Sequence, residues 1–98
     1  MTVFGRAGST VCRMPAISRF LGITIYMYHR EHGLPHFHAV YAGDGISVEV
    51  ESRIVRGSFP GRALRHVLEW AALHEAELLA NWELARQDKP IRRIAPLE

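Results

Sequence analysis

The stretch HFHAVYAGDGISVEV at residues 36–50 decides the fold, because it holds two strand patterns joined by a turn. Its first six residues alternate, so His36 and His38 lie on one face of a strand and Phe37 on the other. The Ala-Gly-Asp-Gly that follows supplies the glycines that a hairpin turn needs at positive φ. Apolar and polar residues then alternate again as a paired strand. Phe37 is apolar and belongs in the core, which leaves the histidine side accessible.

The flanking segments extend this hairpin into an α+β domain. Upstream, residues 16–29 are dense in apolar and β-branched residues and predict a strand that Gly22 interrupts as a bulge or bend. Downstream, residues 54–57 predict a short further strand. Apolar residues at three- and four-residue spacing over residues 60–87 indicate one long amphipathic helix or two that join near His74. We therefore expect a three- to four-stranded antiparallel sheet packed against one long, kinked or straight, C-terminal helix.

The length and composition indicate one small domain. The chain has 98 residues, and residues 1–13 are rich in glycine, serine and threonine with little periodicity. We expect a disordered extension over residues 1–13 and a single domain over residues 14–98. Cys12 has no internal disulfide partner, and no apolar run approaches the roughly 20 residues that span a bilayer. These features predict a cytoplasmic protein with no membrane partner.

The charge distribution argues against general affinity for nucleic acid. The formal net charge is +2, but Arg6 and Arg13 supply it, and the chain from Met14 onward has equal numbers of basic and acidic residues. Phosphate binding would therefore have to come from local clustering of arginines. The sequence also lacks a glycine-rich phosphate loop, a nucleophile elbow and a cysteine metal motif. The common nucleotide-binding and hydrolase fingerprints therefore give no support.

Four histidines fall within ten residues, at His29, His32, His36 and His38. His36 and His38 are two apart in a strand, so their rings share one face and can bind one ion or contact one phosphate. His32 in the preceding loop can close over them, which makes a three-histidine set like that of catalytic zinc. Glu49 or Glu51 on the paired strand can complete it. We nevertheless expect no cofactor, and zinc or another divalent transition metal bound at these residues is the alternative.

Two other interpretations of the histidine pair stay open. His36 and His38 can act as general acid and base in catalysis, because the pKa of histidine lies near neutral pH. They can also be partly buried hydrogen-bonding residues that hold the turn at Gly33-Leu34-Pro35. His66 and His74 fall in the predicted helix, where we expect structural roles.

A candidate nucleic-acid surface lies beside the histidine pair. Four arginines surround the last predicted strand and the start of the helix, namely Arg53, Arg56, Arg62 and Arg65. With the histidines they can contact RNA phosphates, while nearby tyrosines stack on bases. The candidates for stacking are Tyr26, Tyr28 and Tyr41. The alternative is a solvated surface in which the arginines pair with neighbouring carboxylates.

The two tryptophans predict different roles. Trp70 and Trp82 are twelve residues apart, which places them about 120° apart around a single helix axis. The apolar stripe includes Trp82, so Trp82 is expected in the core. Trp70 is expected at the edge of the core or as a partner-binding anchor.

Several motifs in combination resemble the DUF4160 family of small bacterial proteins, over residues 14–97. They are Met14-Pro15-Ala16-Ile17-Ser18-Arg19-Phe20 with Gly22-Ile23, His32-Gly33-Leu34-Pro35-His36-Phe37-His38-Ala39, Trp70 with His74, Glu77-Leu78 and Asn81-Trp82, and Ile94-Ala95-Pro96-Leu97. This chain departs from the family pattern at Leu34-Pro35, where many relatives have two prolines, and at Glu31, where an aspartate is usual. Members usually begin at the Met-Pro that stands here at Met14.

The resemblance implies a prokaryotic protein whose biochemical function is unassigned. Members are often encoded beside a DUF2442 protein, a pairing suspected of being a toxin–antitoxin cassette. The leading expectation is therefore one half of such a pair, with a small protein partner and RNA as the target of a site at His36 and His38. The alternatives are a non-catalytic interaction or regulatory module, which can also form homo-oligomers, and a histidine-based metal-binding protein.

Overall fold

The computed structural model describes residues 16–29 and 31–98, and the extension predicted over residues 1–13 lies outside them, as does Cys12. Within the described residues, five strands form one antiparallel sheet in chain order: β2 (Ala16–Phe20), β3 (Ile23–Tyr26), β4 (His36–Tyr41), β5 (Asp44–Glu49) and β6 (Val55–Gly57). Two helices follow, α1 (Gly61–Leu73) and α2 (Glu75–Arg86). The α+β class and the antiparallel sheet are confirmed. The sheet has five strands where three or four were expected, and two helices take the place of the single long helix.

The additional strand arises at Leu21 and Gly22, which form a two-residue turn where the sequence predicted a bulge or bend. β2 and β3 pair antiparallel on either side of this turn. Its φ angles are positive at both residues, 52° at Leu21 and 79° at Gly22, as the I′ hairpin turn requires. The predicted hairpin between β4 and β5 is confirmed and uses the same geometry, with φ of 50° at Ala42 and 88° at Gly43.

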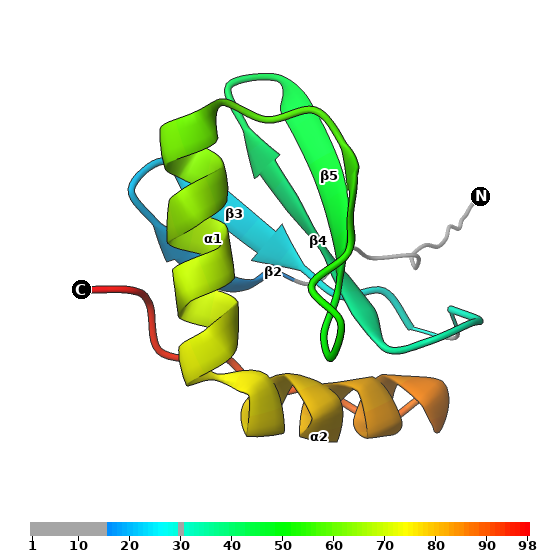
Figure 1. Cartoon of the computed structure of the whole chain (residues 1–98). Coiled ribbons are helices and arrows are strands. Elements are labelled where there is room, and N and C mark those ends of the chain that lie inside the picture. Colours follow the sequence, from blue (N-terminus) through cyan, green and yellow to red (C-terminus); the bar gives the residue numbers. More distant parts are fainter. Residues whose placement is uncertain (1–15, 30) are drawn as a thin grey trace, which may run out of the picture.

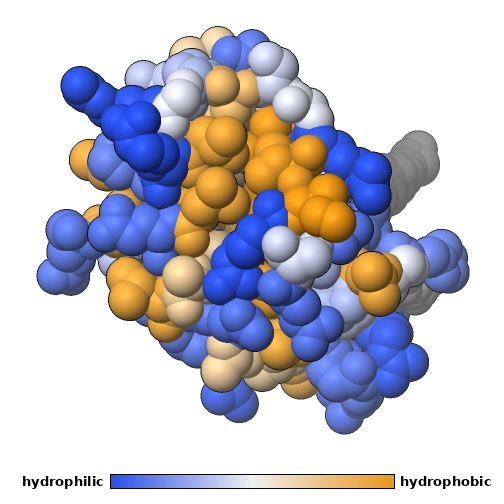
Figure 2. All heavy atoms as spheres, viewed as in Figure 1, coloured by the Kyte–Doolittle hydropathy of each residue, from blue (hydrophilic) through white to orange (hydrophobic). Residues whose placement is uncertain are grey.

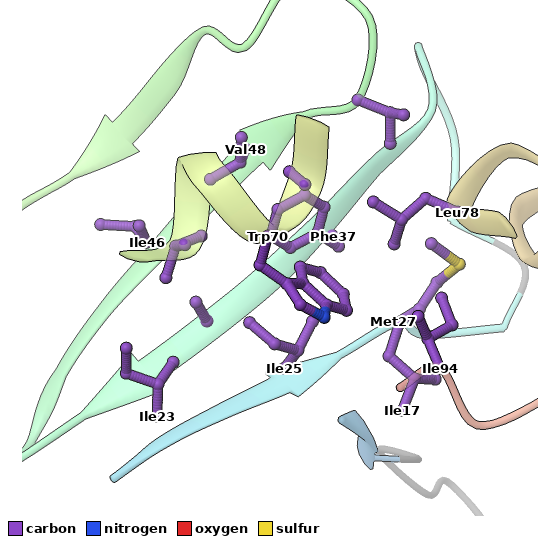
Figure 3. Packing of buried hydrophobic residues seen from close by; sticks show 14 of the residues in the cluster. Ile17, Ile23, Ile25, Met27, Phe37, Ile46, Val48, Trp70, Leu78 and Ile94 are labelled. Carbon is purple, nitrogen blue, oxygen red and sulfur yellow. The ribbon is translucent and has the colours of Figure 1, made fainter. Parts of the chain in front are cut away.

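Strand β4 divides the sheet into two chemically different faces, as its alternation predicted. Phe37 and Ala39 are fully buried beneath α1, and the ring of Trp70 in α1 lies 5.7 Å from that of Phe37. Figure 3 shows the Trp70 indole surrounded by side chains from the sheet and from α2. We call this side the covered face. It carries most of the apolar surface whose burial stabilises the domain.

The opposite side of the sheet, which we call the polar face, carries most of its polar side chains, Tyr26, His36, His38, Ser47, Glu49 and Arg56, together with Thr24 and the exposed Val40. Strand register aligns four of them in one row, because Tyr26 pairs with His38, His38 with Ser47, and Ser47 with Arg56. Neighbouring positions in such a row are about 5 Å apart. The polar face therefore brings residues from four strands to one surface.

The helical region consists of two helices that meet at His74, which confirms the second of the two predicted arrangements. His74 has φ of −120° and ends α1 as α2 begins. Figure 1 shows α1 lying against the sheet and α2 running across the end of the sheet where β4 starts. This position brings α2 next to the loop that precedes β4.

The interpretation of Trp70 as a partner-binding anchor is wrong. Trp70 is completely buried, and its indole N–H donates a hydrogen bond of 2.8 Å to the backbone oxygen of Ala95. Trp82 is buried as expected, with 6% of its surface exposed. The angle of about 120° between the two side chains assumed one continuous helix. Since His74 separates two helices, each tryptophan reaches the core from its own helix.

The C-terminal tail, residues 87–98, packs back onto the domain. Ile94 is buried, and its N–H donates to the oxygen of Ile17 in β2 at 2.8 Å. Leu97 packs partly on the core, whereas Pro96 is exposed. The side chain of Asn81 in α2 also binds the tail, through both the N–H and the oxygen of Arg92. The tail is therefore a fixed part of the fold.

The surface on the α1 side mixes apolar and charged groups. Figure 2 shows hydrophobic atoms near the centre of this view, with charged residues around them. Leu64 and Leu68 of α1 and Val55 of β6 pack partly against the core. Across residues 16–29 and 31–98, none of the helices combines the length and the apolar character that crossing a membrane needs.

Candidate metal centre

A cluster of two histidines and one carboxylate forms where the polar face meets the loop before β4. Alternation along β4 places His36 and His38 on the same side of the strand. The loop between β3 and β4 then brings Glu31 over them. The side chains are all half-buried, with exposed fractions of 18% for His36, 25% for His38 and 32% for Glu31.

The three side chains converge on one point. The Oε1 atom of Glu31 lies 3.0 Å from Nε2 of His36 and 2.8 Å from Nε2 of His38. One ligand atom from each residue can be chosen so that all three lie within 4.8 Å of one another. An ion held at about 2.0–2.2 Å from each ligand needs ligand atoms no more than about 4 Å apart. Small side-chain movements therefore suffice to hold one metal ion.

A backbone contact defines the tautomer of His36. Its Nδ1 lies 2.9 Å from the carbonyl oxygen of Leu34, and a carbonyl oxygen only accepts, so Nδ1 carries the proton. In the neutral ring, Nε2 then presents a lone pair to the carboxylate of Glu31. Two lone pairs at 3.0 Å repel each other, and a positive charge between them, a proton or a metal cation, removes the repulsion.

Aromatic rings hold both imidazoles in place. The Tyr28 ring meets the His38 ring edge-on, with centroids 4.5 Å apart, and the Trp82 ring lies 4.9 Å from that of His36. Burial and the neighbouring charge of Glu31 raise the pKa of the Tyr28 phenol, so it remains protonated at neutral pH. Tyr28 is thus a neutral side chain beside the cluster. Such outer contacts orient the histidine ligands in protein metal sites.

The residues that come together differ from the predicted metal ligands. His32 is exposed, and Glu31 takes the position beside His36 and His38 that the sequence assigned to His32. Glu49 accepts hydrogen bonds from Ser52 and from Arg56, and Glu51 is exposed in the following turn, so neither joins the cluster. The one available signal for Glu31 was the family resemblance, in which an acidic residue precedes the first loop histidine.

The four predicted phosphate-binding arginines do not converge. Arg53 donates to the backbone oxygen of Val50 and pairs with Glu75 at 3.0 Å. Arg62 and Arg65 lie on α1, which packs on the covered face. Arg56 alone among the four lies on the polar face, where its guanidinium is 70% exposed and lies 3.4 Å from Glu49. Arg56 is therefore the arginine of this set that shares a surface with the histidines.

The predicted stacking tyrosines also divide between the two faces. Tyr26 and Tyr28 lie beside His38, but Tyr41 packs partly on the core and contacts the Phe59 ring at 6.0 Å. The remaining described histidines make other contacts. His29 donates to the oxygen of Lys89, and His74 binds the carboxylate of Glu77, while His66 lines a pocket beside Arg62.

The fold and the site together define a small α+β protein. Its antiparallel sheet carries α1 on one face and a two-histidine, one-carboxylate cluster on the other, and α2 runs across one end of the sheet. The family model described as a domain of unknown function (DUF4160) matches residues 22–83, which include the whole cluster. The chain belongs to the DUF4160 family, as its motifs indicated. Comparison with curated proteins and with solved structures found no match.

Proposed function

We propose that this protein binds a divalent transition-metal ion, of the zinc type, through Glu31, His36 and His38. The observation that carries the proposal is the convergence of Nε2 of His36 with the carboxylate of Glu31, while Nδ1 of His36 donates to Leu34. That contact directs the unprotonated nitrogen of the ring at the cluster. Neutral imidazole and carboxylate are the usual protein ligands of zinc.

Three protein ligands indicate an open site. Structural zinc sites use four protein ligands, whereas catalytic sites use three, often two histidines and a glutamate, and keep a position for water or substrate. The same ligand types with open positions also suit non-haem iron. The cluster lies on a sheet surface and remains half-buried, so the ion is reachable from solvent.

Titration calorimetry of untagged, EDTA-dialysed protein with zinc chloride tests this function. We expect one ion per chain, and a loss of affinity of at least about 100-fold in His36→Ala, His38→Ala and Glu31→Gln, because even outer-shell changes cost 10–100-fold. His32→Ala is the matched control, since His32 is an exposed histidine in the same loop. Its affinity should equal that of the wild type.

Two results would overturn the metal proposal. Absence of binding for zinc, iron, cobalt, nickel and manganese makes the cluster a structural group that holds the loop before β4. If His32→Ala loses zinc binding while Glu31→Gln keeps it, the metal ligands are His32, His36 and His38 instead. Trp82 fluorescence provides a second signal, because its ring lies 4.9 Å from that of His36.

A second candidate function is RNA targeting as one half of a toxin–antitoxin-like pair, and the position of Arg56 favours it. Arg56 and Tyr26 share a row with His38, which supplies a cation and an aromatic ring beside a titratable pair. Without a metal, cleavage needs one histidine to accept the 2′-OH proton and the other to protonate the leaving oxygen.

Induced expression distinguishes the two functions. Metal-independent RNA targeting predicts growth arrest that the double variant His36→Ala with His38→Ala abolishes and that Arg56→Ala weakens. It also predicts that the purified protein cleaves RNA in the presence of EDTA. Arg65→Ala, on α1, is the control. Co-expression with a DUF2442-type protein, the partner that the family resemblance implies, tests the pairing and should suppress the arrest. Absence of any arrest contradicts a toxin role and leaves the metal proposal to its own test.

A further inference from the structure

A groove of about 630 Å³ lies between α2 and the C-terminal tail, away from the histidine cluster. Its apolar lining comes from Ala80 and Leu84 of α2 and from Ile94 of the tail. The carboxylates of Glu77 and Glu83 lie along the α2 side. Three basic residues of the tail line the groove as well, namely Lys89, Arg92 and Arg93.

The tail side of the groove is fixed by hydrogen bonds. Asn81, which is 2% exposed, donates to the oxygen of Arg92 and accepts from its N–H, and Ile94 donates to Ile17. The indole N–H of Trp70 donates to the backbone oxygen of Ala95, the tail residue after Ile94. A ligand in this groove therefore meets backbone that is already ordered, which lowers the entropic cost of binding.

The acidic side chains of the groove have hydrogen-bond partners, whereas its basic side chains form no ion pair with described residues. Glu77 binds His74, and Glu83 accepts hydrogen bonds from Arg86 and Gln87. Across residues 16–29 and 31–98, no carboxylate lies within ion-pair distance of the three basic side chains. The chain from Met14 onward has balanced charge overall. Lys89, Arg92 and Arg93 are therefore a local concentration of positive charge, and none of the three forms an ion pair within the described residues.

We propose that this groove binds an extended acidic segment of a partner protein, one that alternates acidic and aliphatic side chains. Acidic side chains of the segment face Arg92, Arg93 and Lys89, while aliphatic ones cover Leu84 and Ile94. The proposal goes beyond metal binding and uses none of the metal ligands. It rests on charge complementarity at a preformed, partly apolar groove.

Two features of the lining favour a peptide over RNA. None of the residues that line the groove is aromatic, whereas single-stranded nucleic acid is bound chiefly by stacking on aromatic rings. The α2 side also presents two carboxylates, which repel a polymer with a negative charge at every nucleotide. A peptide avoids this conflict because it can place uncharged residues beside Glu77 and Glu83.

A random-peptide display library, selected on the full chain, tests the proposal. We expect enrichment of peptides that combine Asp or Glu with Leu, Ile or Val. Their affinity should fall at least 10-fold in Arg92→Glu with Arg93→Glu, and it should also fall as salt is raised. The matched control is Arg62→Glu with Arg65→Glu, which makes the same change of charge at exposed arginines on α1. This control should bind the selected peptides as tightly as the wild type.

A second variant tests the groove without altering the arginines. Ala80 is exposed on α2, and Ala80→Glu keeps a good helix former while placing a carboxylate against the bound acidic segment. It should weaken peptide binding by a similar factor and leave the circular dichroism spectrum unchanged. Selection without acidic enrichment overturns the proposal, and so does equal weakening by the α1 pair. If a single-stranded RNA oligonucleotide binds more tightly than the selected peptides, and this binding requires Arg92 and Arg93, the groove is a nucleic-acid site instead.

Discussion

Adjacent residues of β4 have opposite environments: Phe37 is completely buried on the covered face, whereas His36 and His38 on either side of it face the Glu31 carboxylate. The covered face is a continuous apolar core that includes side chains from both helices. The polar face holds titratable groups that contact a loop. One side of β4 therefore contributes to stability and the other carries the candidate site. Substitutions on the two sides should have separate effects on stability and on metal binding.

The largest expected effect comes from the covered face. Phe37→Ala removes a wholly buried ring that packs against Trp70, and we expect a loss of about 3–5 kcal/mol in the free energy of unfolding. The neighbouring His38→Ala, at a half-buried position with one hydrogen bond, should cost about 1 kcal/mol. Urea denaturation followed by circular dichroism measures both. Equal losses in the two variants would contradict the division between the faces.

The proposed metal site predicts that zinc stabilises the protein through Glu31, His36 and His38 alone. At a free zinc concentration about 100 times the Kd, linkage raises the free energy of unfolding by about 2.7 kcal/mol. Phe37→Leu should keep this increment, because the core substitution leaves the ligands in place. His36→Ala should lose it. Denaturation curves with and without zinc measure the difference, and an increment that persists in His36→Ala would place the ion elsewhere.

A backbone constraint at the edge of the sheet should have an intermediate effect. Gly57 has φ of 110°, and an added Cβ would lie 2.6 Å from the oxygen of Gly45. Gly57→Ala should therefore cost about 1–3 kcal/mol. Gly61→Ala is the control, because no neighbouring atom lies within 4 Å of its added Cβ at the start of α1. It should be neutral or stabilising by up to about 1 kcal/mol.

The smallest effect is expected at Arg56. Its guanidinium is 70% exposed and its contact with Glu49 is 3.4 Å long, so Arg56→Ala should change the free energy of unfolding by no more than about 0.5 kcal/mol. Arg53→Ala breaks better-buried bonds to Val50 and Glu75 and should cost about 1–3 kcal/mol. Chemical denaturation of both variants checks the ranking. A larger cost at Arg56 would show that the polar face also contributes to stability.

Local patterns predicted much of this architecture correctly. Alternation in β4 identified both faces, because successive side chains of any strand point to opposite sides. The glycines after Tyr41 predicted the hairpin. The turn at Leu21 and Gly22 escaped prediction, since a leucine at positive φ is rare and the flanking residues continue an apolar strand pattern.

The sequence correctly placed His36 and His38 side by side, whereas the loop residue beside them is Glu31 and not the expected His32. His36 and His38 were paired by the two-residue period of the strand, which is a local property. A loop has no such period, so the choice between Glu31 and His32 depends on how the backbone from Glu31 to Pro35 folds over β4. The four arginines are close in sequence but lie in different elements and therefore point to different surfaces: Arg53 precedes β6, Arg56 is in β6, and Arg62 and Arg65 are in α1.

The sequence by itself determined the α+β class, the hairpin of β4 and β5, and the pairing of His36 with His38, because each follows from short-range periodicity and turn chemistry. Only the tertiary structure decided that Glu31 completes the cluster, that Trp70 is buried, and that the tail joins α2 to form a basic groove. Those three features depend on contacts between residues far apart in the chain or on the conformation of a loop. Such contacts are selected by packing of the whole domain.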